Sequence, residues 1–310
     1  MNRKTVPDNF TGRSLADIVG TAVLGPEPCM AAPLDELIFD VTTAALRNAQ
    51  MALADIDAVY MATSDVFDGR AISTMTLTAS TGSFGKHEMR VCDDGLGALA
   101  LAADGLRSGS ADAALVTSWS KLSEANLDVI DPLAVEPAFH RPLGLRSSVV
   151  AALQRSSWKG HPTTVVPAVY EVGDAAVSLV LARPDARANR RGRLLGAGWS
   201  SGPYLRPEGT PLRPLTEAVA RALADASLEP NDVHGLHCGG FFDISDEELA
   251  EAAGVSVPVH RSDQGGMELG YATGLLALID ALASPGRRLV VSRAGIGTSR
   301  AYAVVVEGAP

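Results

Sequence analysis

Two consecutive parts of this 310-residue chain carry the same succession of hydrophobic patterns. In each part, apolar runs typical of buried strands alternate with segments whose apolar residues recur at helical spacing, and two further strands close the series. The expected strands cover 14–25, 56–65, 87–92, 111–119 and 175–183, then 193–201, 235–240, 257–264, 287–295 and 300–308. The expected helices cover 34–52, a segment ending near 81, 94–107 and 143–158, then 212–227, 245–254 and 270–284. The repetition predicts an α/β fold made of two similar halves, 1–188 and 189–310.

Charge and cysteine content narrow the possible partners. The formal net charge is −10, from 26 basic and 36 acidic residues, and basic residues are dense only at 183–193. Nucleic acid and anionic membrane surfaces are therefore not expected as partners. The three cysteines, Cys29, Cys92 and Cys238, are too few and too scattered for a disulfide framework or a four-ligand zinc site. We expect a cytoplasmic protein without a bound metal.

The chain carries no pattern of export or membrane anchoring. The first 14 residues include early basic residues but no apolar core of a signal peptide. No apolar run reaches the roughly 18 residues that a membrane span needs. We therefore expect no membrane partner.

A single cysteine stands where an expected strand turns into an expected helix. Cys92 ends the apolar segment 87–92, and the small-residue helix 94–107 follows at once. The free N–H groups of a helix start favour a thiolate, so Cys92 is a candidate nucleophile; the alternative is an inert buried thiol. Asp93 and Asp94 act against a thiolate by their charge, although acidic residues also stabilise the first turn of a helix.

Three stretches resemble the thiolase superfamily. The stretch VCDDGLGALALAADGLRSGSADAALV (91–116) follows its pattern around the nucleophile. The shared features are the cysteine, a Gly-Leu pair, an Ala-rich helix, a Ser-Gly break and an Ala-Asp strand. GDAAVSLVLA (173–182) is similar to the strand that closes the first half of β-ketoacyl-ACP synthase III enzymes. TSWSKLSEAN (117–126) resembles a region of sterol-carrier-type thiolases, and its Ser118, Trp119 and Lys121 are expected in a tunnel, a subunit contact or surface packing. The resemblance implies a five-layer αβαβα fold built from two βαβαβαββ halves.

The resemblance also implies a set of site residues. Cys92 would carry the acyl group, and His237 in GLHCGG would assist as a base or oxyanion donor. Tyr271 in LGYATG occupies the place where the family has asparagine or histidine. Backbone N–H groups of the AGIGTS turn, at Gly295 and Gly297, would lie near the thioester. On residue type alone, a core histidine is the favoured interpretation of His237, and Tyr271 could instead plug the pocket.

The implied function is that of an acyltransferase or condensing enzyme. Its substrate would be an acyl-CoA or acyl-carrier-protein thioester, with no separate cofactor, and it would work as a homodimer or as a heterodimer with a related subunit. Two alternatives stay open. The pair Asp93 and Asp94 suits a non-catalytic partner subunit of a ketosynthase or thiolase-type complex, and Tyr271 suits a thiolase-like carbon–carbon lyase.

Overall fold

The computed structural model describes most of the chain. The described residues are 14–63, 73–91, 93–126, 128, 141–144, 146, 149, 171–184, 186, 189–202, 212–241, 244–262, 267–293 and 300–309. Cys92, Gly295 and Gly297 lie outside these ranges, as do the loop 65–72 and nearly all of the expected helix 143–158. Within the described ranges, no helix is both long and apolar enough to span a membrane.

The first half alternates strands and helices in the predicted order. Its elements are β1 (Ala16–Glu27), α1 (Leu34–Ala49), β2 (Ala58–Ala62), α2 (Ser73–Thr81), β3 (His87–Val91), α3 (Gly95–Ser108), β4 (Ala113–Lys121), β5 (Glu171–Val172) and β6 (Asp174–Ala182). Short 3-10 turns follow α1 at Leu53–Asp55 and β4 at Leu122–Glu124, and a third covers Arg141–Leu143.

The second half repeats the alternation. Its elements are β7 (Gly192–Ser201), α6 (Arg213–Ala226), β8 (Leu236–Gly239), α7 (Asp246–Ala253), β9 (Val259–Arg261), β10 (Met267–Glu268), α8 (Thr273–Leu282), β11 (Gly286–Arg293) and β12 (Arg300–Gly308). Two 3-10 turns, Pro230–Asp232 and η5 (Gly270–Ala272), precede β8 and α8.

The main strands form one ten-stranded sheet in the order β3-β2-β4-β6-β1-β7-β12-β11-β8-β9. From the centre outward, each half places its main strands in the same order: first, fifth, fourth, second, third. The halves meet where β1 pairs antiparallel with β7, with Ala16 opposite Leu194. The duplication expected from the hydrophobic pattern is therefore present in the topology.

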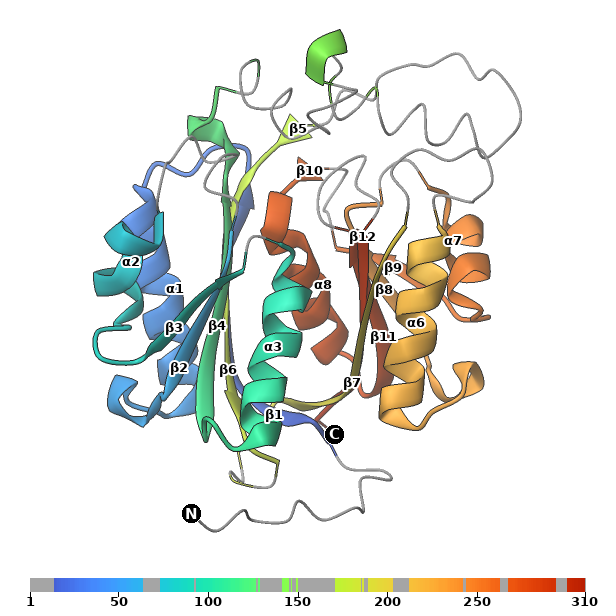
Figure 1. Cartoon of the computed structure of the whole chain (residues 1–310), viewed down its shortest axis with the longest axis horizontal. Helices are drawn as coiled ribbons and strands as arrows, with labels where there is room; N and C mark the ends of the chain where they lie inside the picture. Colours follow the sequence, from blue (N-terminus) through green and yellow to red (C-terminus); the bar gives the residue numbers. More distant parts are fainter. Residues whose placement is uncertain are drawn as a thin grey trace.

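Helices cover both faces of each half-sheet and create five layers (Figure 1). One outer core packs α1 against β2, β4 and β6, and the other packs α6 and α7 against β8, β11 and β12. Between the half-sheets, α3 and α8 share a central core that includes Leu96, Leu99, Leu275 and Leu278. The middle layer thus consists of one helix from each half.

Local sequence signals account for the ends of several helices. Asp94 caps α3 by accepting a hydrogen bond from the backbone of Leu96, and Gly109 ends the helix at a φ of 76°. α7 begins with a capping box, because Ser245 and Glu248 bond reciprocally to each other's backbone N–H groups. These caps place the first turn of α3 directly after β3.

The structure differs from the sequence-based expectation in three details. The helix expected at 270–284 begins as the 3-10 turn η5 and becomes α-helical only at Thr273. Among the described residues of the strand expected at 257–264, only Val259–Arg261 forms a strand. The parallel pair β5–β10 was not expected, because two-residue strands leave no hydrophobic periodicity.

Candidate functional site at the start of α3

In the chain, Cys92 stands between the end of β3 and the start of α3. β3 ends at Val91 and α3 begins at Gly95, so the predicted strand-to-helix order is confirmed on both sides of the cysteine. Cys92 itself lies outside the described residues, and its role stays a prediction. The site is therefore built here from the residues that flank it.

Asp94 is a fully buried carboxyl group between the starts of the two central helices. Its Oδ1 accepts hydrogen bonds from Leu96 N at 2.8 Å and from Ser292 Oγ of β11 at 2.6 Å. The backbone N–H of Gly274, in the first turn of α8, lies near this carboxyl group and lowers its pKa. A Cβ at position 274 would lie 2.2 Å from Asp94 Oδ1, so only glycine allows this approach. The carboxyl group thus joins α3 to α8 and β11.

The second oxygen of Asp94 is in a different situation. Within the part of the chain that the structure describes, this buried Oδ2 has no hydrogen-bond partner. Burial raises the pKa of Asp94 to about 7; the hydrogen bonds from Ser292 and Leu96 oppose this rise, and the charge of Asp93 adds to it. Near neutral pH, Asp94 therefore exchanges between its protonated and ionised forms.

Asp93 binds the start of β12. Its Oδ2 accepts a hydrogen bond from Arg300 Nη1, and its Oδ1 accepts one from Asp94 N at 3.0 Å. Burial, followed by the charge of Asp93, raises the pKa of Tyr302 above its ordinary range. The segment 294–299, which contains Gly295 and Gly297, ends directly before Arg300. Its C-terminal flank is thus bound to the residue that follows Cys92.

The two aspartates therefore do more than the sequence suggested. The sequence indicated a charge effect on the thiol or a helix-stabilising first turn, and Asp94 does cap α3. In addition, both side chains bind the second half, through Ser292 and Arg300. Sequence reasoning missed Ser292, Arg300 and Gly274 because these partners carry no local signal and lie about 200 residues away in the chain.

Tyr271 lies beside the start of α3. It belongs to η5, which leads into α8, and its half-buried side chain packs against the central core. Its carbonyl oxygen accepts a hydrogen bond from Ser118 Oγ of β4 at 2.7 Å. The same oxygen would lie 3.2 Å from a Cβ placed on Gly95. The structure thus brings the backbone of Tyr271 to the first residue of α3.

His237 occupies a different place, within β8. Its side chain is 4% exposed and stacks on His260 of β9, with ring centroids 4.7 Å apart and planes inclined by 22°. Neither ring nitrogen has a hydrogen-bond partner among the described residues. Burial lowers the pKa of His237 to about 4, and the charges of His260 and Arg288 act in the same direction. The imidazole is neutral at neutral pH.

The start of α8 meets β8 two residues beyond His237. Gly239, two residues further along β8, is the position that meets α8, since its Cβ would lie 2.3 Å from the Thr273 side chain. Gly239 pairs with Ser292, the residue that binds Asp94. Two residues of strand correspond to about 6.6 Å. His237 therefore interacts with His260 of β9 and with the charge of Arg288 of β11, at this edge of the sheet. Its catalytic role stays a prediction.

The pKa of His237 predicts a pH-dependent contribution to stability. Between pH 4 and 6.5 the folded state binds fewer protons at this site than the unfolded state, so the free energy of unfolding rises with pH by at most about 1.4 kcal/mol per unit. We expect His237→Leu to remove this dependence, and to stay within about 1.5 kcal/mol of wild type at pH 7 because both ring nitrogens are unpartnered among the described residues. Urea unfolding at several pH values measures both effects, with the exposed His87→Leu of β3 as a control; an unchanged acid dependence in His237→Leu would contradict the assignment.

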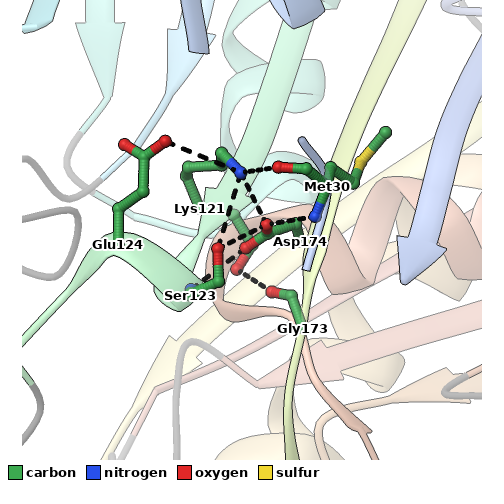
Figure 2. A network of polar contacts seen from close by, with 7 residues as sticks. Met30, Lys121, Ser123, Glu124, Gly173 and Asp174 are labelled. Atoms are coloured by element: carbon green, nitrogen blue, oxygen red, sulfur yellow. Dashed lines mark hydrogen bonds and ion pairs between the residues drawn. The ribbon is translucent and has the colours of Figure 1, made fainter. Parts of the chain in front are cut away.

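A buried ion pair stands at the C-terminal end of β4 (Figure 2). Lys121 Nζ lies 2.7 Å from Asp174 Oδ2, and the two side chains are 2% and 0% exposed. Lys121 also donates to the Met30 carbonyl at 2.5 Å, while Asp174 accepts from the backbone and hydroxyl of Ser123 and from Met30 N. Lys121 is thus buried rather than part of a surface. The network joins β4, β6 and the segment after β1.

The described residues contain no group of three or more His, Cys, Asp or Glu side chains that could hold a metal ion. The polar groups at the start of α3 are instead two carboxyl groups; one is paired with Arg300, and the other has an oxygen without a hydrogen-bond partner in the described part of the chain. Such a set can accept and release protons.

Comparison with solved structures identifies the fold as thiolase-like. Peroxisomal 3-ketoacyl-CoA thiolase of Saccharomyces cerevisiae, a five-layered structure of two core domains with identical topology, superposes with a TM-score of 0.65 at 16% identity, covering 95% of this chain and 98% of that chain. For 3-oxoacyl-[acyl-carrier-protein] synthase III from Aquifex aeolicus VF5 the TM-score is 0.63 at 17% identity, covering 94% and 99%. For the Ltp2-ChsH2(DUF35) aldolase it is 0.65 at 14% identity, covering 96% and 98%.

The predicted thiolase-like, five-layer α/β fold is therefore confirmed over nearly the whole chain. Neither a protein-family model nor a curated protein matches the sequence. The fold is shared by condensing enzymes and an aldolase, so the particular activity is argued separately below.

Proposed function

We propose that this protein transfers acyl groups from an acyl-CoA or acyl-carrier-protein thioester through a covalent intermediate on Cys92. The observation that carries the proposal is the place of this cysteine between β3 and α3 of a thiolase-like fold. The N–H groups at a helix start favour the thiolate, and a thiolate attacks a thioester carbonyl. The acceptor is a carbanion, which gives a condensation, or a hydroxyl or amine.

The other predicted site residues take supporting roles in this proposal. Tyr271 donates a hydrogen bond from its hydroxyl, because its backbone already lies at the start of α3. Backbone N–H groups of Gly295 and Gly297 hold the oxyanion, since their segment ends at the Arg300 that binds Asp93. His237 serves as a neutral hydrogen-bond donor, which its low pKa supports.

We further propose that the protein works as a homodimer or as a heterodimer with a related subunit. β3 stands at one edge of the ten-stranded sheet and is only partly buried. An edge strand presents unpaired backbone groups to which a partner strand can bind. The scarcity of cysteines supports a cytoplasmic location.

Intact-mass measurement after incubation with acyl-CoA and acyl-carrier-protein substrates tests the proposal. We expect a mass gain of one acyl group in the wild type and its loss in Cys92→Ala. The exposed Cys29 and the buried Cys238 provide matched controls, and Cys29→Ala and Cys238→Ala should keep the adduct. An adduct that survives Cys92→Ala, or none with any thioester, contradicts the proposal.

A carbon–carbon lyase is the second candidate. It is supported by the structural similarity to the Ltp2-ChsH2(DUF35) aldolase and by the tyrosine at position 271. This candidate predicts no acyl adduct but a loss of lyase activity in Tyr271→Phe. The role of a non-catalytic partner subunit has less support than the sequence alone gave it. Arg300 offsets the charge of Asp93, and burial favours the neutral form of Asp94.

A further inference from the structure

A cavity of about 400 Å³ lies between α1 and α2, the two helices of one outer layer (Figure 1). Pockets that bind small molecules commonly have volumes of this order. The cavity is open to solvent on one side, because several of the side chains around it are exposed. Its walls include Phe39, Thr43, Leu46 and Arg47 of α1 and Ala79 and Ser80 of α2.

The apolar part of the wall is surface of α1 that the sheet does not cover. One face of this helix packs on the sheet through Leu37 and Val41. Phe39 and Leu46 follow a neighbouring stripe of the helix and face the cavity. Phe39 is 53% exposed, and Leu53 of the next turn, which also lines the cavity, is 38% exposed. A hydrocarbon ligand would remove this apolar surface from water.

The cavity is separate from the place of Cys92 in the fold. Leu53 and Gly82, which line the cavity, precede the first residues of β2 and β3 by five positions each. α3 begins instead after the other end of β3, beyond Val91. A strand of this length spans about 16 Å. A ligand in the cavity therefore does not occupy the proposed acyl site.

Arg47 is the one charged residue among the described residues that line the cavity. Within the part of the chain that the structure describes, its exposed side chain forms no ion pair or hydrogen bond. The exposed Arg107, Arg183 and Arg213 all pair with carboxylates of the protein. In a chain with a net charge of −10, Arg47 thus keeps its guanidinium available for a carboxylate from outside.

The helix ends at the cavity are already capped. Free carbonyl groups at the ends of α1 and α2 would repel an anion. After α1, the N–H groups of Gln50 and Met51 bond to carbonyl groups of its last turn. After α2, those of Gly82 and Ser83 do the same. These bonds reduce the negative charge that the helix ends present, so the guanidinium of Arg47 governs which ligand head is bound.

We propose that this cavity binds a free medium-chain carboxylate, with the hydrocarbon chain against Phe39 and Leu53 and the carboxylate on Arg47. At about 30 Å³ per non-hydrogen atom, the cavity holds about a dozen such atoms. A saturated acid of about ten carbons matches this size. The hydroxyl groups of Thr43 and Ser80, which form no hydrogen bond with the described residues, donate to the second carboxylate oxygen.

Isothermal titration calorimetry with decanoate tests the proposal. In the wild type we expect a Kd of about 1 mM or tighter, the affinity of a ligand of this size at an ordinary efficiency per atom. Decylamine has the same chain and the opposite charge, and acetate has the same head without the chain. Each should bind at least about 10-fold more weakly than decanoate.

Two substitutions separate the carboxylate contact from the apolar contact. Arg47→Gln should weaken decanoate binding by about 10-fold and remove the preference over decylamine. Ala79→Trp fills the cavity from an exposed helix position and should abolish binding. Arg213→Gln and Ala224→Trp make the same changes at exposed positions of α6, and both should bind decanoate as the wild type does.

Hydrogen exchange locates the bound ligand. Decanoate should slow exchange in the last turns of α1 and α2. The proposal is overturned if decanoate does not bind, if it binds equally well to Arg47→Gln and Ala79→Trp, or if it protects another part of the chain instead. Arg47→Gln decides alone if Ala79→Trp does not fold. Because the two sites are separate, a missing acyl adduct on Cys92 rejects acyl transfer without affecting this result.

Discussion

Replacing Lys121 with methionine should lower the free energy of unfolding by about 3–5 kcal/mol. The ammonium group lies 2.7 Å from Asp174, and both side chains are almost fully buried. Methionine fills a similar volume but leaves the Asp174 carboxylate without its counter-charge. Burial raises the pKa of Asp174, and hydrogen bonds from Lys121, Ser123 and Met30 outweigh that effect and hold the pKa below its ordinary value. Chemical denaturation at pH 7 measures the loss.

A double-mutant cycle and a surface pair provide the controls. Lys121→Met combined with Asp174→Asn should cost less than the two single changes added together, because no uncompensated charge then stays buried. Arg213→Ala removes an exposed i,i+4 ion pair with Glu217 and should change stability by less than about 1 kcal/mol. An equal effect of Lys121→Met and Arg213→Ala would show that the buried pair contributes no more than a surface pair.

The second large effect is a loss of stability with rising pH caused by Asp94. Its pKa is about 7 in the folded state and 3.8 as the ordinary value, so between these values the folded state holds a proton that the unfolded state has lost. The free energy of unfolding must then fall as pH rises through this interval. At about 1.4 kcal/mol per pH unit, this single proton lowers the free energy of unfolding by about 4 kcal/mol between pH 3.8 and about 7.

Asp94→Asn isolates this effect. The amide cannot ionise, so the variant should be close to wild type near pH 4 and more stable than wild type by up to about 4 kcal/mol at pH 8. His237 acts in the opposite direction between pH 4 and 6.5, so the wild-type curve alone is flatter than either contribution. The difference between wild type and Asp94→Asn must therefore be measured at each pH. A constant difference would mean that Asp94 is ionised throughout.

Hydrophobic periodicity predicted much of the fold. Continuous apolar runs such as 111–119 and 175–183 indicated buried strands, and they are β4 and β6, each buried along its whole length. The helical spacing of apolar residues placed the ends of α3 and α7 within one residue, at 94–107 and 245–254. The pairing of β1 with β7 left no such signal, because strand partners depend on register between distant segments.

The candidate site divides in the same way. The order of strand, cysteine and helix start around Cys92 could be predicted from the sequence, because it depends on neighbouring residues. The partners of Asp93 and Asp94 were not, since Arg300 and Ser292 reach them from 207 and 198 residues away. Lys121 was read as a tunnel, interface or surface residue, although its charge is matched inside the protein by Asp174, 53 residues further on.

The sequence by itself determined the repeated succession of strands and helices and the position of one cysteine at a strand-to-helix turn, because both depend on residues close in the chain. Only the tertiary structure decided which charges are paired, which carboxyl oxygen is left without a partner among the described residues, and that His237 lies two residues from the strand position next to α8. Those properties depend on burial and on register between the two halves.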